Sequence, residues 1–102
     1  MDVNYEKLFA AIYELAVKDD FETVCGRLAW ELTAEGADIS EAKMYIDKRK
    51  DYIKRRVQEN VYQEAMEWGS GESRKIQRDN INTLVAEVID EYKRENKLPQ
   101  TV

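Results

Sequence analysis

The chain contains a single proline, Pro99, so the residues before it include none that forces a helix to end. Four glycines interrupt a sequence in which apolar residues recur at helical spacing. The whole chain has 102 residues and a mass of 12.0 kDa, which is enough for one hydrophobic core. We therefore predict an all-α fold: a small bundle of about four helices in a single domain over residues 1–98, with residues 99–102 as a frayed C-terminal tail.

Three short segments are predicted to separate the helices. Gly36 stands where a helix favours a left-handed residue at its C-terminus, and residues 69–73 contain two glycines and two serines. Lys18-Asp19-Asp20 forms the third segment, because Asp19 followed by Glu22 resembles a helix-capping box. Asp38 followed by Glu41 repeats that pattern. We expect helices over about 4–18, 20–35, 39–68 and 72–96.

The expected helix over residues 39–68 is unusually long. At 1.5 Å per residue it spans about 45 Å, whereas a compact chain of this length is about 33 Å across. This helix must therefore bend, split near Glu59-Asn60 or project from the bundle. Its second half is apolar on several sides, so one amphipathic face does not bury all of it. We expect a homodimer, with Tyr62, Met66 and Trp68 near the interface.

Charge is distributed unevenly along the chain. The formal net charge is −5, from 16 Lys and Arg against 21 Asp and Glu. Residues 1–42 carry ten acids and three bases, whereas residues 43–58 carry seven bases and two acids. The net charge is therefore the average of an acidic first part and a basic segment.

The basic segment forms a stripe in which tyrosines alternate with arginines. Tyr45, Arg49, Tyr52 and Arg56 share one helix face, because they follow each other at offsets of 0, 4, 7 and 11 residues. Such a stripe binds phosphates or an acidic protein, or it pairs with the acidic helices of the same chain. If it binds a partner, Arg49→Glu with Arg56→Glu abolishes binding and leaves the melting temperature nearly unchanged. The candidate partner-binding residues are Lys43, Tyr45, Lys48, Arg49, Tyr52, Arg55 and Arg56.

Residues 27–47 resemble a helix-turn-helix of the kind found in arginine-repressor-type DNA-binding proteins. In this resemblance Gly36 makes the turn between the two helices. It implies that the buried anchors are Leu28, Leu32, Ile39, Ala42 and Ile46. It also implies that Ser40, Lys43, Met44 and Lys48 face the DNA groove.

Composition excludes most catalytic centres. The chain has no histidine, which rules out Ser-His-Asp and Cys-His catalytic groups, and its single cysteine rules out an internal disulfide and a tetrahedral Cys/His zinc site. Cys25 follows an apolar helix seam, so we expect it to be a core residue. Carboxylates are the only remaining catalytic groups. Glu64, Glu67, Glu87 and Asp90 form an ExxE…ExxD pattern that resembles the magnesium-binding signature of MazG-like nucleotide pyrophosphohydrolases, which would imply Mg²⁺ on a triphosphate.

These observations favour a small non-enzymatic binding or regulatory protein with no cofactor and no metal. We expect a protein partner, engaged through the basic face over residues 43–56 or through an inhibitor-like acidic face of the first two helices that mimics nucleic acid. DNA binding is the main alternative, and the pyrophosphohydrolase is the more distant one. No apolar run approaches the roughly 20 residues that span a bilayer, so we expect no membrane contact. The lone thiol is typical of the reducing cytoplasm.

Overall fold

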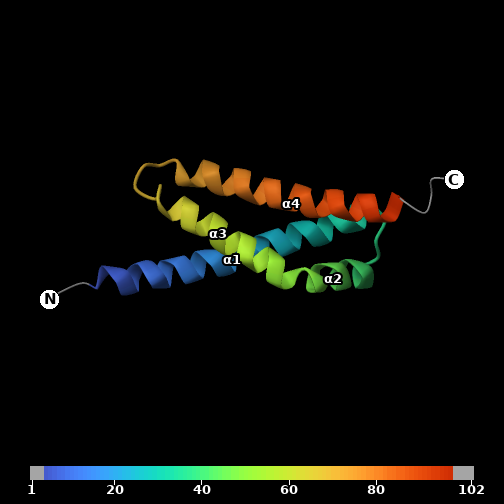
Figure 1. The fold of residues 1–102 in the computed structure, drawn as a ribbon, viewed down its shortest axis with the longest axis horizontal. Coiled ribbons are helices and arrows are strands. Elements are labelled where there is room, and N and C mark those ends of the chain that lie inside the picture. Colours follow the sequence, from blue (N-terminus) through green and yellow to red (C-terminus); the bar gives the residue numbers. More distant parts are fainter. Residues whose placement is uncertain (1–3, 98–102) are drawn as a thin grey trace.

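The computed structural model describes residues 4–97 and is all-α there, with four helices and no strand (Figure 1). The helices are α1 (Tyr5–Ala34), α2 (Ile39–Lys48), α3 (Lys50–Ala65) and α4 (Ser73–Lys97). This confirms the predicted four-helix bundle, while the predicted tail over 99–102 lies outside the described residues. Within the described part of the chain, no helix is sufficiently long and apolar to cross a membrane.

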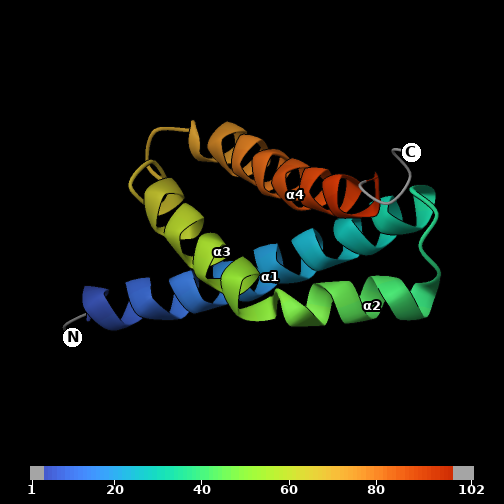
Figure 2. The same ribbon diagram turned by 45° about the vertical axis from the view of Figure 1, so that its right-hand side comes forward.

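The molecule is elongated, because α1 extends beyond the other helices (Figure 1). Its dimensions are 69 × 24 × 17 Å and its radius of gyration is 16.6 Å, compared with about 13 Å for a compact chain of this length. Figure 2 shows α3 crossing α1 and then diverging from the first half of α1 toward the α3–α4 connection. The first half of α1 therefore receives less cover than the second half.

The predicted break at Lys18-Asp19-Asp20 is wrong, because α1 runs without interruption for 30 residues. No glycine or proline stands there to end a helix, and Asp20 is buried against the other helices. The main-chain oxygen of Asp19 accepts a bond from Thr23 Oγ1 at 3.0 Å, inside the same helix. The capping pattern read at Asp19 is thus an exposed polar position on a continuous helix.

The end of α1 follows the prediction closely. Gly36 has a φ of +108°, the left-handed conformation that glycine adopts without strain. The amides of Gly36 and Ala37 donate to the main-chain oxygens of Thr33 and Leu32, which forms a Schellman motif. Asp38 Oδ1 then accepts from the amide of Glu41 at 2.8 Å and caps α2, as the sequence predicted.

The predicted long helix over 39–68 is wrong, because the chain divides it into α2 and α3 at Arg49. Arg49 has φ −106° and ψ 7°, outside the helical region, so the split lies ten residues before the expected position near Glu59-Asn60. The third helix has 16 residues, and the longest is α1. The sequence around Arg49 carries neither glycine nor proline, and the break coincides with contacts of the Arg49 side chain to Glu91 and Glu95 of α4.

The hydrophobic core lies where α2, α3 and α4 cover the second half of α1 (Figure 2). Val24, Leu28 and Leu32 of α1 have no exposed surface. They pack with side chains from the three other helices. The remaining core residues are Val17, Ala37, Ala42, Ile46, Ile53, Val57, Val61, Leu84, Val85, Val88 and Ile89.

Two carboxyl groups are buried at the border between the two halves of α1. Asp20 accepts a hydrogen bond from Gln77 Nε2 at 2.6 Å, and Glu64 accepts one from Asn80 Nδ2 at 3.1 Å. Burial raises the pKa of Glu64 to about 7; the Asn80 bond opposes this shift, and the nearby Asp20 adds to it. Burial also raises the pKa of Asp20 against the opposing bond from Gln77. The two carboxyl groups and their amide partners thus join α1, α3 and α4, and the charge on this contact depends on pH.

Candidate protein-binding surface

The tyrosine and arginine stripe predicted from the sequence is divided by the break at Arg49, so Tyr45 lies on α2 whereas Tyr52 and Arg56 lie on α3. Arg49 Nη2 contacts Glu91 Oε1 and Glu95 Oε1 of α4, both at 3.1 Å. Burial lowers the pKa of Arg49, but its hydrogen bond to Glu91 and the nearby charges of Glu91 and Glu95 together outweigh this effect, so the pKa is raised. Arg49 therefore joins the α2–α3 junction to α4.

Arg56 makes a second ion pair with α4. Its Nη1 lies 2.5 Å from Glu87 Oε2 and 2.6 Å from the hydroxyl of Tyr52. The hydrogen bond to Glu87 is the main cause that raises the pKa of Arg56. Two of the predicted partner-binding cations are thus paired inside the chain, and their partners belong to α4 rather than to the acidic first part that the sequence suggested.

Tyr45 is largely covered by these contacts. Its ring meets Tyr92 edge-on at 5.2 Å between centroids, and the Arg49 guanidinium carbon lies 3.5 Å from the ring centroid. Burial raises the pKa of Tyr45 to about 12. Its hydroxyl is buried and has no hydrogen-bond partner among residues 4–97. Tyr45 therefore packs between helices and offers little surface to a partner.

The other predicted residues of the stripe remain exposed. Lys43 and Lys48 lie on α2 and Arg55 lies on α3, all open to solvent. Tyr52 is partly exposed, with the guanidinium carbons of Arg55 and Arg56 each 5.7 Å from its ring centroid. The structure thus divides the predicted surface into a paired part and a free part.

A groove between α1 and α3 brings together basic and apolar side chains that the sequence reading did not combine. It has a volume of about 460 Å³. Val17 and Phe21 of α1 supply apolar surface, and Lys50 and Lys54 come from α3. The other residues that line it are Tyr13, Glu14, Lys18 and Gln58.

The groove has a defined shape, because the Tyr13 hydroxyl donates to the main-chain oxygen of Gln58 at 3.0 Å and ties α1 to α3. Lys18, Lys50 and Lys54 are exposed, and none of them forms an ion pair within the described residues. Lys50 and Lys54 stand one helical turn apart inside the basic segment, so their spacing was visible in the sequence. Lys18 belongs to the acidic first part and is added only by the fold.

The predicted interface residues Tyr62, Met66 and Trp68 are exposed. Trp68 also contacts the first half of α1, because its ring lies 5.6 Å from the ring of Phe9 between centroids. Tyr62 and Met66 follow one another by a helical turn, on the side of α3 away from its buried residues. Their exposure is compatible with the predicted dimer interface, which stays a prediction.

The four carboxylates of the MazG-like pattern have separate surroundings. Glu64 is buried beside Asn80, Glu67 accepts a bond from Ser70 Oγ, and Glu87 pairs with Arg56. Asp90 is exposed on α4. Among the described residues, no cluster of three or more Asp, Glu, Cys or His side chains is suited to holding a metal ion. The arrangement that this resemblance implied is therefore not assembled here.

The helix-turn-helix resemblance is reproduced in part. Leu28, Leu32, Ala42 and Ile46 are buried as expected, whereas Ile39 is exposed and is not an anchor. Residues Ser40, Lys43, Met44 and Lys48 are all at the surface of α2.

Cys25 is half-buried, and burial raises the pKa of its thiol. It packs against the core margin, as expected for a structural residue.

Comparisons of the chain with protein-family models, curated proteins and solved structures give no match.

Proposed function

We propose that this is a non-enzymatic, protein-binding regulatory module that holds an acidic segment of a partner protein in the groove between α1 and α3. The observation that carries the proposal is the convergence of Lys18, Lys50 and Lys54 on an apolar floor that includes Phe21. Three ammonium groups around apolar side chains suit a peptide that presents both carboxylates and a hydrophobic side chain.

Charge supports a peptide over a long nucleic acid. Beyond the basic segment the chain is strongly acidic, and its net charge is −5. An extended polyanion would meet this negative field along most of its length, whereas a short peptide contacts only the groove. Arg49 and Arg56 are already paired with α4, so among the described residues the unpaired cations of residues 43–58 are Arg55 and the lysines. The single half-buried thiol of Cys25 is in keeping with a cytoplasmic protein.

The proposal is tested by fluorescence anisotropy with a short labelled peptide of glutamate and leucine. The test variant is Lys50→Glu with Lys54→Glu, which reverses charge at the groove. The matched control is Lys43→Glu with Lys48→Glu, which makes the same change in charge on α2. We expect at least tenfold weaker binding for the test variant and a change of less than threefold for the control.

A labelled DNA duplex in the same assay addresses the main alternative. The observation that favours DNA binding is the exposure of Ser40, Lys43, Met44 and Lys48 on a ten-residue α2. Tight duplex binding that is lost in the Lys43→Glu, Lys48→Glu variant and kept in the groove variant would replace the present proposal with that alternative. Equal loss of peptide binding in both variants would show that charge alone, and not the groove, determines it.

A further inference from the structure

The first half of α1 carries an apolar seam that the helices of residues 4–97 leave exposed. Tyr5, Leu8, Ile12 and Leu15 follow one another at spacings of 3, 4 and 3 residues, which is the a/d pattern of a coiled coil. Tyr5 is 76% exposed and Leu15 is 69% exposed, and the two residues between them are also exposed. We name these four residues the arm seam.

The arm seam is a separate surface from the proposed peptide groove. Phe9 contacts Trp68 of the α3–α4 connection, and Tyr13 bonds to Gln58 of α3. Helical spacing places Leu8 and Leu15 on the side of α1 away from the groove residues Val17 and Phe21. The two surfaces share no residue, so binding at one does not require the other.

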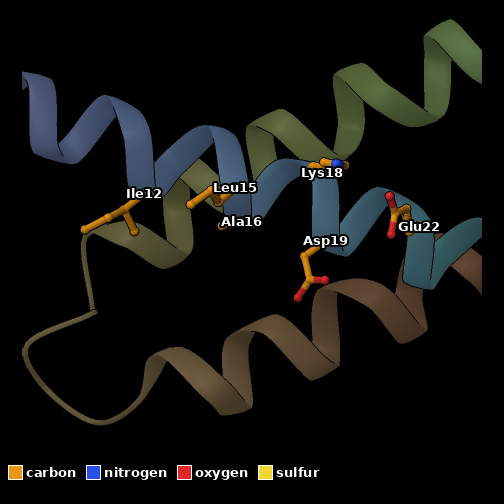
Figure 3. A pocket seen from close by; sticks show the side chains of 6 residues that line it. All are labelled: Ile12, Leu15, Ala16, Lys18, Asp19 and Glu22. Atoms are coloured by element: carbon orange, nitrogen blue, oxygen red, sulfur yellow. The ribbon is translucent and has the colours of Figure 1, made fainter.

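A shallow hollow of about 490 Å³ runs along α1 from Ile12 to Glu22, so it begins at the arm seam and ends in the second half of the helix (Figure 3). Figure 3 shows that the six side chains that line it all come from α1, with Ile12, Ala16 and Asp19 along one side. A hollow lined by one helix is closed only when another helix lies against it. Asp19 and Glu22 mark the point where the apolar run ends.

We propose that a second copy of this chain covers the arm seam, so that the protein is a homodimer paired through the first halves of two antiparallel α1 helices. Two observations support this dimer. The arm seam has heptad spacing and is exposed, and the segment that carries it has no net charge. Residues 5–18 carry two acids and two bases, whereas the whole chain has a net charge of −5. Two copies can therefore meet at this segment without the repulsion that the rest of their surface would produce.

The area of the arm seam, taken together with the neighbouring Phe9 and Trp68, approaches what a pair of chains requires. The exposed fractions of the arm seam, Phe9 and Trp68 add up to roughly three fully exposed side chains. At about 200 Å² for each large side chain, one copy contributes about 600 Å² and two copies about 1,200 Å². That total reaches the lower limit of specific protein interfaces, about 1,200 Å².

The order of residues in the arm seam is compatible with two-fold symmetry between two antiparallel copies. Antiparallel pairing places Leu8 against Ile12 of the second copy and Tyr5 against its Leu15, so every layer joins an a position to a d position. Ala11 flanks the arm seam on the side away from Phe9 and meets its own equivalent across the axis. Its small side chain allows the two helices to approach closely.

Sedimentation equilibrium at tens of micromolar tests the proposal with paired variants. Leu8→Glu with Leu15→Glu places charge in the arm seam, and we expect a monomer. Trp30→Glu with Ile39→Glu makes the same kind of change at two exposed apolar residues elsewhere, and we expect it to stay a dimer like the unmodified chain. Because glutamate at two sites could unfold the arm, Leu8→Ala with Leu15→Ala, which favours helix, serves as a second variant and should raise the dissociation constant at least tenfold.

Three results would overturn the dimer through the arm. They are a monomeric mass for the unmodified chain up to the highest concentration reached, a dimer that survives both arm variants, and a dimer lost instead in a Tyr62→Glu, Met66→Glu variant. The Lys50→Glu, Lys54→Glu groove variant should remain dimeric. The groove variant therefore tests peptide binding and the arm variants test the dimer, so each proposal can fail without the other.

Discussion

The two halves of α1 have similar apolar spacing but different surroundings. In the second half, residues 20–34, Val24, Leu28 and Leu32 are completely buried beneath the three other helices. In the first half, residues 5–18, Leu8 and Leu15 follow the same kind of helical repeat and remain exposed. Apolar periodicity therefore identifies a face that favours burial, but it does not say whether the same chain or another chain covers it.

The border between the halves coincides with the break that the sequence suggested at residues 18–20. The helix continues through this point, and what changes is the cover over it. Asp20 is the first of two buried carboxyl groups at the border, and Asp19 ends the apolar run of the first half. The polar pair Asp19-Asp20 thus marks a change of packing partner along one helix.

Truncating one leucine in each half gives the largest expected contrast. Leu28→Ala removes a fully buried side chain and should lower the free energy of unfolding by about 2–5 kcal/mol. Leu15→Ala should change it by less than about 0.5 kcal/mol in dilute solution, where the chains are separate. Urea denaturation followed by circular dichroism at low micromolar concentration measures both, and equal losses would contradict the difference in cover.

The buried carboxyl pair at the border predicts that stability falls as pH rises. The pKa of Glu64 is about 7 in the folded chain against 4.5 ordinarily, so the folded state keeps a proton that the unfolded state has released. Its stabilising effect is complete below pH 4.5 and is lost as pH rises through 7. The loss is about 3 kcal/mol at most, from the difference in pKa.

Urea denaturation at a series of pH values measures this effect. Glu64→Gln removes the titrating group and should flatten the curve between pH 5 and 8, because the amide stays neutral. Glu59→Gln on the exposed side of α3 is the matched control and should leave the curve unchanged. Stability that increases across this window in the unmodified chain would contradict the assigned environment of Glu64.

The smallest expected effect comes from changing Arg49. This residue joins the α2–α3 junction to α4, and these are the helices that cover the second half of α1. Arg49→Met removes its contacts to Glu91 and Glu95, both of which are partly exposed, so the expected loss of stability is about 1 kcal/mol. Arg55→Met, an exposed position on α3, should change stability by less than about 0.5 kcal/mol. Thermal denaturation of the two variants side by side distinguishes a paired arginine from a free one; equal melting temperatures would contradict the pairing.

Local signals in the sequence predicted the fold class and several helix ends. The conformations of Gly36 and Asp38 follow from their residue types and near neighbours, so their roles could be predicted without the tertiary structure. The break at Arg49 could not, because it accompanies contacts to glutamates more than 40 residues away. The long third helix was therefore wrong, whereas the break near residue 19 was wrong because a capping pattern without glycine or proline does not end α1.

The candidate site was predicted in its location along the chain but not in its composition. The basic segment was evident from charge, and Lys50 and Lys54 belong to it. Sequence alone did not show that α4 neutralises Arg49 and Arg56, or that Lys18 of the acidic first part joins the groove. Those facts depend on which helices lie side by side.

Oxidative cross-linking at Ala11 tests most directly the claim that a second copy covers the first half of α1. Ala11→Cys in a Cys25→Ser background places one thiol beside the predicted two-fold axis, and Ser40→Cys in the same background places one on exposed α2. On mild oxidation at tens of micromolar, we predict a disulfide-linked dimer as the main product of the Ala11 variant and mostly monomer for the Ser40 variant. Equal, low yields of cross-linked dimer from both would contradict the account.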